Sequence, residues 1–172
     1  DGTLLRAFRS GHRIGMDPSM EAQDGVDGWS QEFFSVDRYW KLADQPAKVV
    51  TSIAMFYDID DPVAFAEEVR SILSEDGVWI IEVSSLPMMA ASGAFDGVCH
   101  EHLCFYSLST LLAVLAQAGF LVDGTGTNQI NGGSVWVSAR PSSAWRSVAV
   151  RTDLRNLTAV LSRTQKCLRQ WV

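Results

Sequence analysis

The chain has 172 residues, enough for one domain with a hydrophobic core of ordinary size. Hydrophobic residues make up 47% of it and charged residues 20%, which is typical of a soluble globular protein. The formal net charge of −6 and the lack of any block of Lys and Arg argue against a nucleic-acid-binding protein.

The cysteines and the apolar segments favour a cytoplasmic protein. Three cysteines without a C-x-x-C pair are typical of reduced thiols, not of a secreted domain stapled by disulfides. The longest apolar run, GVWIIEVSSLPMMAA, is interrupted by Glu82 and by serines and is too short to span a membrane. The pattern of a signal peptide, a basic region followed by an apolar segment, is not found either.

The first part of the chain predicts short helices and strands in alternation. TLLRAFRSG has apolar residues at helical spacing and closes on Gly11, a favourable residue just past a helix end. HRIGMDPS predicts a short strand that ends at Asp17, and PSMEAQDG predicts one or two helical turns. SQEFFSV predicts another short strand, and RYWKLADQPA predicts a helix that stops before Pro46.

The middle of the chain carries the clearest elements. AKVVTSIAM is a β-branched run that predicts a strand buried on both faces. The helix after it has Asp60 or Asp61 as its cap, Pro62 in its first turn and Gly77 at its end. GVWIIEVSS predicts a second buried strand directly after this helix, whereas residues 86–97 show no clear period.

The last part of the chain predicts a helix, two closing strands and a further helix. SLSTLLAVLAQAGF is helical, with a Ser cap and a terminal Gly119. FLVDGTGTNQ and GSVWVSARP predict two strands around an INGG turn, whose glycines are expected to adopt φ > 0. Residues 154–171 predict an amphipathic helix.

This order of elements predicts an α/β fold with a mostly parallel sheet and an antiparallel edge strand. The chain opens at a helix start, with no strand before it. In doubly wound folds a central strand and a glycine-rich turn precede such a helix, and Asp1 and Gly2 resemble the end of that turn. We therefore expect a fragment from which the first strand is missing.

Asp17 stands where doubly wound folds bind the ribose of a nucleoside. It ends the predicted strand IGM, and a carboxylate can accept one hydrogen bond from each hydroxyl of a vicinal diol. The alternative is that Asp17 only caps the turn before Pro18. Neither G-x-G-x-x-G nor G-x-x-x-x-G-K-[ST] is present, so nothing points to a dinucleotide or a nucleoside triphosphate.

The stretch CHEHLCFY, residues 99–106, concentrates groups that can move a proton or hold a metal. If HEHL is extended, His100 and His102 lie on one side and Glu101 on the other. With Cys99 and Cys104 these histidines offer enough ligands for zinc. The orders H-x-E with P-C-x-x-C, and H-E-x-x-H, are both absent, which favours an acid–base site over a metal site. A purely structural patch is the third alternative, and the two cysteines are most simply small buried side chains.

Several motifs together resemble one enzyme family. They are DGTLL, GMDPS, EFFS, SIAMFYDIDDP, FDGVCHEHLCFYSL and NGGS. In this order they resemble the class I, Rossmann-like, S-adenosylmethionine-dependent C-methyltransferases of nucleotide-linked keto-deoxysugars, over residues 1–140. The resemblance implies that residues 1–150 are a methyltransferase core and that residues 151–172 are a linker helix. It also implies a missing N-terminal domain with a zinc-binding cysteine cluster, and a missing C-terminal domain.

The family reaction places a methyl group on a carbon beside a ketone, which requires a base to remove a proton from that carbon. Histidine suits this role because its ordinary pKa of about 6.5 leaves it largely neutral at cytosolic pH. The resemblance implies that His102 is the base, in a triplet with His100, and that Glu101 binds or orients the sugar. Tyr57 and Tyr106 are candidate donors to the developing enolate oxygen.

The resemblance also implies a site for S-adenosylmethionine and none for a metal in this chain. Asp1 and Gly2 would contact its methionine end, Asp17 its ribose, and Phe34 with Ser35 its adenine. The end of the AKVVTSIAM strand would lie near the sulfonium, which adds Ser52, Ile53 and Met55. Each of these residues also has a purely structural interpretation in the core or in a strand.

Three other functions stay open at this point. The acceptor is either a nucleotide sugar or another small molecule. The chain is alternatively a non-catalytic fragment that keeps the fold, or an NAD-dependent sugar enzyme with the same architecture. The expected partners are a nucleotide-sugar substrate and the missing flanking domains, with neither nucleic acid nor membrane.

Overall fold

The computed structural model describes residues 2–9, 11–19, 21–22, 24–94 and 97–142. Asp1, the predicted helix at 154–171 and the linker assignment for 151–172 therefore lie outside the described residues. The chain forms two compact units, residues 1–47 and 48–172. No helix in the described part of the chain combines the length and apolarity that crossing a membrane requires.

The first unit holds two short helices and a parallel strand pair. These are α1 (Thr3–Ala7), β1 (Ile14–Met16), β2 (Gly28–Ser30) and α2 (Val36–Leu42). Strands β1 and β2 pair in parallel, with Ile14 opposite Gly28. Gly15 lies so close to Trp29 that a Cβ atom there would come within 2.1 Å of the indole ring, so the indole packs directly on the β1 backbone.

Several predicted boundaries in this unit are wrong. Helix α1 ends at Ala7, well before Gly11, and the segment PSMEAQDG forms no helix in its described residues. The second strand precedes SQEFFSV, and α2 begins at Val36 because the Ser35 hydroxyl accepts a hydrogen bond from the Arg38 N–H and caps it.

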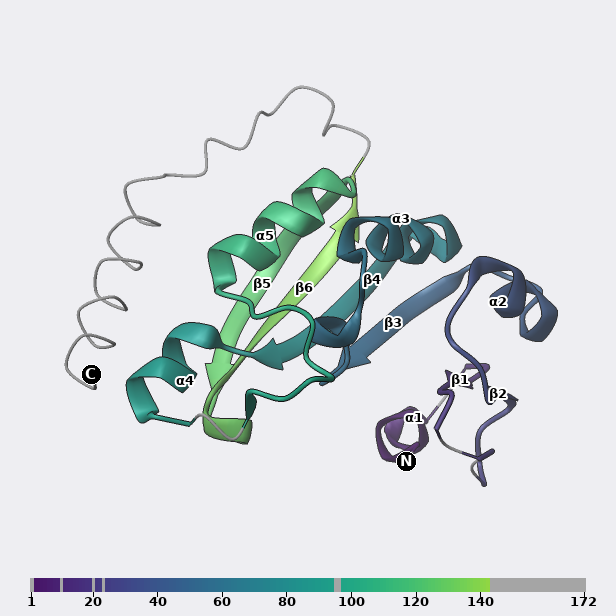
Figure 1. Ribbon diagram of the computed structural model, residues 1–172. Coiled ribbons are helices and arrows are strands. Elements are labelled where there is room, and N and C mark those ends of the chain that lie inside the picture. The colour runs from purple at the N-terminus through teal and green to yellow at the C-terminus, as the bar shows by residue number, and fades with distance from the viewer. Residues whose placement is uncertain (1, 10, 20, 23, 95–96, 143–172) are drawn as a thin grey trace. The chain divides into compact units, whose positions relative to one another are not determined.

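The second unit contains the larger sheet and its helices. Its elements are β3 (Ala47–Ile53), the 3₁₀ helix η1 (Phe56–Asp58), α3 (Pro62–Ile72), β4 (Leu73–Ser84), α4 (Leu86–Ser92), α5 (Leu108–Gln117), β5 (Phe120–Asn128), the 3₁₀ helix η3 (Ile130–Gly132) and β6 (Ser134–Pro141). The strand order is β3-β4-β6-β5. Figure 1 shows β3 and β4 running in the same direction, joined through α3.

Strand β6 is antiparallel to both of its neighbours, β4 and β5. The predicted α/β class is confirmed, and the two closing strands do form an antiparallel edge. The strand that runs against the others is β6, which is inserted between β4 and β5, while β5 is the outer strand. The INGG turn has the predicted backbone: Gly132 and Gly133 have φ of 77° and 120°.

The core lies between the sheet and the helices α3 and α5, which Figure 1 shows on one face of it. Alternate residues of β4 and β6 point into this core, and Ile81 pairs with Val137 across the two strands. An aromatic cluster fills its centre, where the rings of Phe56 and Phe120 each lie within 5.4 Å of Trp79, measured between centroids. Such burial is the main source of stability in a domain of this size.

Two boundaries in the second unit depend on tertiary contacts. Helix α3 ends at Ile72 and β4 starts at once, before the predicted end at Gly77. The exposed Asp76 in this extension is held by Lys48 of β3, and its carbonyl accepts from Arg140 of β6. Residues 86–92, which show no apolar period, form the helix α4.

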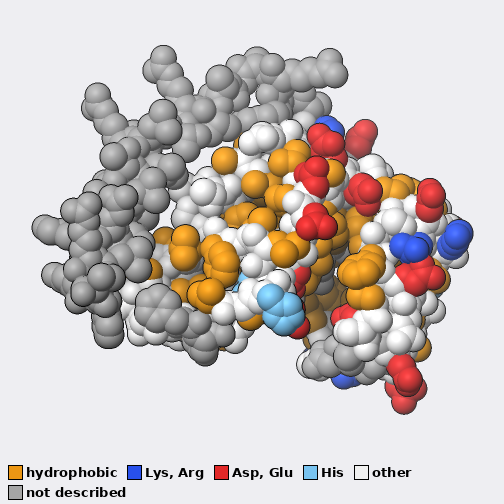
Figure 2. Space-filling model, viewed as in Figure 1, with side chains coloured by type: hydrophobic (Ala, Val, Ile, Leu, Met, Phe, Trp, Pro, Cys, Tyr) orange, Lys and Arg blue, Asp and Glu red, His pale blue; other side chains and the backbone are white. Residues whose placement is uncertain are grey.

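Figure 2 shows acidic side chains gathered over α3 and the turn that leads into it. Asp60, Asp61, Glu67 and Glu68 are exposed there. The sign of this surface is opposite to that of the patches which attract nucleic-acid phosphates.

Candidate functional site

His100 and Glu101 lie in a turn and His102 directly follows it, so the HEH triplet is not part of a strand. His100 and Glu101 are turn residues and are exposed, while His102 is half-buried. The two-sided alternation that an extended HEHL segment would give therefore does not apply. Cys99 is exposed as well, so the interpretation of both cysteines as buried side chains is wrong for Cys99, and Cys104 is half-buried.

The imidazole of His102 packs on the ring of Tyr57. Their centroids are 4.1 Å apart and their planes are tilted by 44°. Tyr57 belongs to η1, directly after β3, and only 8% of it is exposed. The ring of Phe105 lies 6.1 Å from the same imidazole at 63°. His102 is thus in contact with a buried aromatic ring that the end of β3 positions.

Cys104 ties this loop to the residues after β3. Its N–H donates to the Tyr57 carbonyl over 2.9 Å, and its thiol donates to the Ile59 carbonyl over 3.8 Å. Tyr106 attaches the end of this loop to the segment after β4. It forms an isolated β-bridge with Ser85, and its carbonyl accepts a hydrogen bond from the Leu86 N–H over 2.8 Å. The loop is therefore held at its carboxyl-terminal side by two backbone segments, residues 57–59 and residues 85–86.

Tyr106 is buried, with 4% exposure, and its ring stacks on Phe56 at 5.6 Å. Its hydroxyl makes no hydrogen bond to any of the described residues. Burial, with a smaller contribution from Cys104, raises the pKa of Tyr106. A phenol with a raised pKa stays protonated at neutral pH and remains a hydrogen-bond donor.

Charges gather around the Tyr57–His102 pair. Burial raises the pKa of Tyr57, and the neighbouring Asp58 and Cys99 raise it further. Burial also raises the pKa of Asp58, while His102 lowers it and Glu101 raises it. Asp58 was not among the residues that the sequence singled out, although its place directly after Tyr57 in the DIDDP segment was a usable signal. No group of three potential metal ligands occurs among the residues that the structure describes.

The end of β3 combines a core residue with a strained one. Ser52 is buried and its hydroxyl accepts from the indole N–H of Trp79 over 3.0 Å, so its side chain belongs to the core. Ile53 is exposed and Met55 is half-buried. Between them Ala54 has φ of 54°, in the left-handed region, and its N–H donates to the Glu82 carbonyl. Backbone strain of this kind is concentrated at functional sites.

The first unit carries the other expected cofactor residues. Gly2 precedes α1 with a left-handed φ of 67°. Oδ1 of Asp17 accepts from the Ser19 N–H over 2.8 Å and from the Ser19 hydroxyl over 2.7 Å, so Asp17 does cap its turn. These two bonds also fix the orientation of its carboxylate. Phe34 is half-buried, and Ser35 caps α2.

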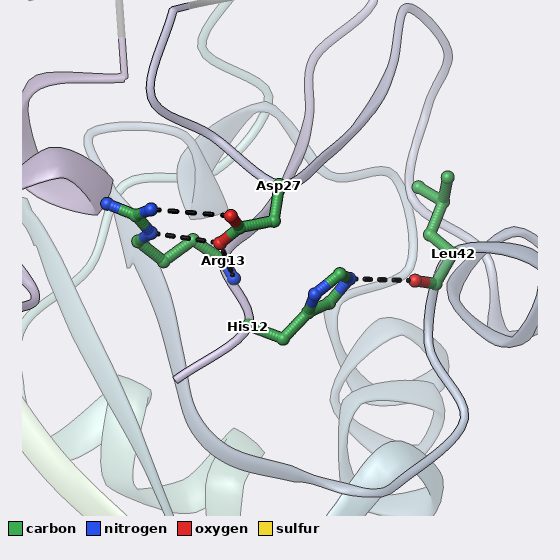
Figure 3. A network of polar contacts seen from close by, with 4 residues as sticks. All are labelled: His12, Arg13, Asp27 and Leu42. Carbon is green, nitrogen blue, oxygen red and sulfur yellow. Dashed lines mark hydrogen bonds and ion pairs between the residues drawn. The ribbon is translucent and has the colours of Figure 1, made fainter. Parts of the chain in front are cut away.

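The third histidine has a structural role in this unit (Figure 3). His12 Nε2 lies 3.1 Å from the Leu42 carbonyl, which joins the segment before β1 to the end of α2. Beside it, the Arg13 guanidinium binds both carboxylate oxygens of Asp27, and the Arg13 N–H donates to the same carboxylate. These bonds lower the pKa of Asp27 and hold β1 beside β2.

Within the second unit, then, two neighbouring residues of η1 each contact one of the predicted site residues: Tyr57 packs on His102, and Phe56 stacks on Tyr106. His100 and Glu101 lie on the exposed turn next to them. A half-buried imidazole beside a buried phenol is suited to proton transfer and to donation of a hydrogen bond.

Comparisons with known proteins relate this arrangement to an enzyme family. Residues 1–123 match the profile of a family described as "Methyltransferase domain". C-methyltransferase NovU from Streptomyces niveus is 31% identical over 98 residues, which are 57% of this chain. The matched region is 23% of NovU, so the chain spans about a quarter of that protein.

Solved structures share the fold. A methyltransferase in complex with the Trm112 activator from Haloferax volcanii has a TM-score of 0.61, with 14% identity over 81% of this chain and 75% of that chain. A LepI variant in complex with SAH and a substrate analogue has a TM-score of 0.59, with 12% identity over 78% of this chain and 37% of that chain. At this identity the likeness concerns the fold alone.

Proposed function

Since the chain belongs to the methyltransferase-domain family, we propose that it transfers a methyl group from S-adenosylmethionine to a carbon beside a ketone on a nucleotide-activated deoxysugar. The single observation that carries the proposal is the half-buried imidazole of His102, packed on the buried ring of Tyr57. The similarity to the C-methyltransferase NovU supports carbon as the methylated atom.

His102, Tyr106 and Glu101 have different roles in the proposed reaction. Methylation of carbon requires removal of a proton from it, and His102 is the base that takes this proton. The enolate oxygen that develops on the neighbouring carbonyl then needs a hydrogen-bond donor. Tyr106 fits this role because its hydroxyl is buried, protonated and without a partner among the described residues. Glu101, on the exposed turn, binds or orients the sugar hydroxyls.

The described residues also fit a nucleoside-containing cofactor. S-adenosylmethionine, when bound, supplies an electrophilic methyl group. Asp17 would accept hydrogen bonds from its ribose, since a carboxylate can accept one from each hydroxyl of a vicinal diol. The left-handed Gly2 at the start of α1 allows a close approach of backbone to the ligand. In the second unit, the exposed Ile53 and the half-buried Met55 are the residues proposed to contact the cofactor.

Replacement of His102 in the full-length protein tests this function. His102→Gln should lower methyl transfer by about 10²- to 10⁴-fold, the usual contribution of a general base. Binding of S-adenosylhomocysteine, measured by isothermal titration, should stay unchanged because His102 does not bind the cofactor.

Two matched variants accompany the test. His12→Gln removes an imidazole whose contact is with the Leu42 carbonyl and should leave transfer intact. His100→Gln should reduce transfer less than His102→Gln does. Normal turnover by His102→Gln, or a larger loss in His100→Gln, would remove His102 from the mechanism. Failure to bind S-adenosylhomocysteine in the unaltered protein would favour a non-catalytic role.

A further inference from the structure

We propose that Tyr57 is a positioning residue, whose ring sets the orientation of the His102 imidazole. The consequence for catalysis rests on the proposed function, in which His102 is the base. The contact itself is independent of that function and can be measured separately.

The first argument is the ring geometry. A centroid distance of 4.1 Å is shorter than the 4.5–7 Å range common for aromatic pairs, so the two rings are in direct contact. Tyr57 is buried, whereas His102 is half-buried. The tyrosine ring is therefore the fixed surface and the imidazole is the partner that it orients.

The second argument is that Tyr57 holds the same loop through its backbone. Its carbonyl accepts from the N–H of Cys104, two residues after His102, over 2.9 Å. The backbone bond fixes the distance of the loop from η1, and the ring contact fixes the plane of the imidazole. The more distant ring of Phe105, at 6.1 Å, borders the imidazole as a second contact.

The third argument is the position of η1 in the fold. It follows β3 directly, and the adjacent Phe56 is fully buried against Trp79 and Tyr106. Tyr57 is thus anchored to the core on one side and in contact with His102 on the other. Active-site groups need to be held within about 0.5 Å of their productive position, and this contact gives a half-exposed histidine such support.

Nuclear magnetic resonance tests the contact directly. The chain has three histidines, so the imidazole signals are few and can be assigned with His12→Gln and His100→Gln. We expect nuclear Overhauser effects between the Tyr57 and His102 ring protons in the unaltered chain of 172 residues. We also expect a ring-current displacement of the His102 signals, which Tyr57→Phe keeps and Tyr57→Leu removes.

Tyr39→Leu is the matched control. Tyr39 is buried to 7% exposure, close to the 8% of Tyr57, but its ring partner is Trp40. The His102 signals should be unchanged in Tyr39→Leu. No Overhauser effect, or the same displacement in Tyr57→Leu as in the unaltered protein, would overturn the proposal without any reference to activity.

Kinetic measurements distinguish a role of the Tyr57 ring from a role of the Tyr57 hydroxyl. Tyr57→Leu should lower kcat by about 10²-fold, as a displacement of about 1 Å at a reacting group does. The KM for S-adenosylmethionine should change little, and Tyr57→Phe should keep most of the rate. A loss in Tyr57→Phe equal to that in Tyr57→Leu would overturn the proposal, because it would assign the effect to the hydroxyl. If the resonance results hold while His102→Gln turns over normally, the proposed function fails and the positioning contact stands.

Discussion

The indole N–H of Trp79 donates a hydrogen bond to the hydroxyl of Ser52 across 3.0 Å inside the core, and this bond joins β4 to β3. Both side chains are almost completely buried, at 0% and 4% exposure. Buried polar groups are nearly always hydrogen-bonded, and here the indole N–H and the hydroxyl are each other's partner. The hydroxyl of Ser52 is therefore used within the core, and any contact with a cofactor would come from its backbone.

Ser52→Ala should destabilise the protein by about 1–3 kcal/mol, because it leaves the buried indole N–H without a partner. Urea unfolding followed by circular dichroism measures the change. A double-mutant cycle with Trp79→Phe isolates the bond from the packing of the larger ring. A coupling energy near zero in that cycle would show that the bond contributes nothing.

Tyr106→Phe should affect stability and activity in opposite directions. Removing a buried hydroxyl without a partner should leave the free energy of unfolding unchanged or raise it by about 1 kcal/mol. Methyl transfer should fall, because the enolate oxygen loses its donor. Thermal unfolding and initial rates on the same preparation check both effects, and a destabilised variant with a normal rate would contradict the assignment.

Gly133→Ala should be clearly more destabilising than Gly93→Ala. Both residues have positive φ, of 120° and 69°. Gly93 is in the left-handed helical region, where alanine costs about 1–2 kcal/mol, whereas Gly133, with ψ of 118°, lies outside the regions that alanine can adopt at that cost. A Cβ at Gly133 would also lie 2.6 Å from Cβ of Met88, whereas Gly93 has no atom within 4 Å of that position. Equal unfolding midpoints for the two variants would show that α4 is not packed on the NGGS turn.

The Arg13–Asp27 pair should make stability depend on pH in the acid range. Hydrogen bonds from Arg13 lower the pKa of Asp27 from 3.8, so the unfolded chain takes up the proton first as the pH falls. The stabilisation is fully present above pH 3.8, and it is lost as the pH falls through the pKa that Asp27 has in the folded protein. Unfolding of Asp27→Asn and the unaltered protein should therefore converge at low pH, and a constant difference would exclude the linkage.

The dependence of stability on pH that Asp58 contributes should have the opposite sign to that of Asp27. Burial and Glu101 raise its pKa above 3.8, so the folded state holds the proton longer as the pH rises. The stability of the protein then decreases as the pH rises from 3.8 to the raised pKa of Asp58 in the folded state. Asp58→Asn should be relatively more stable than the unaltered protein above this window and equal to it below. Parallel stability curves for the two proteins would show that the carboxylate is not desolvated.

Local signals in the sequence were sufficient for several elements. The Asp61 side chain caps α3 through the Ala64 N–H, with Pro62 in the first turn, as these residue types predict. Ser107 caps α5 and forms a reciprocal capping box with Thr110. The glycines of the INGG turn also behave as predicted. The β-branched run does form the strand β3, but the prediction that it is buried on both faces is wrong, because Val49 and Ile53 are exposed. In each case the determining groups lie within a few residues of one another.

Other elements depend on contacts between distant segments. Helix α4 has no apolar period, and it packs through Met88 on Gly133 and through Ser92 on the Gly132 carbonyl. The early start of β4 depends on Lys48 and Arg140, from two other strands. No periodic pattern within residues 73–92 indicates that these distant residues are their partners.

By itself, the sequence determined the α/β class, the caps of α3 and α5 and the candidate histidines, because periodicity, capping and turn preferences act over a few neighbouring residues. Only the tertiary structure decided that His102 packs on Tyr57, that His100 and Glu101 form a turn and that Ser52 belongs to the core. These outcomes depend on which side chains meet after the sheet has formed. Packing and desolvation between distant segments, which no local pattern encodes, select those contacts.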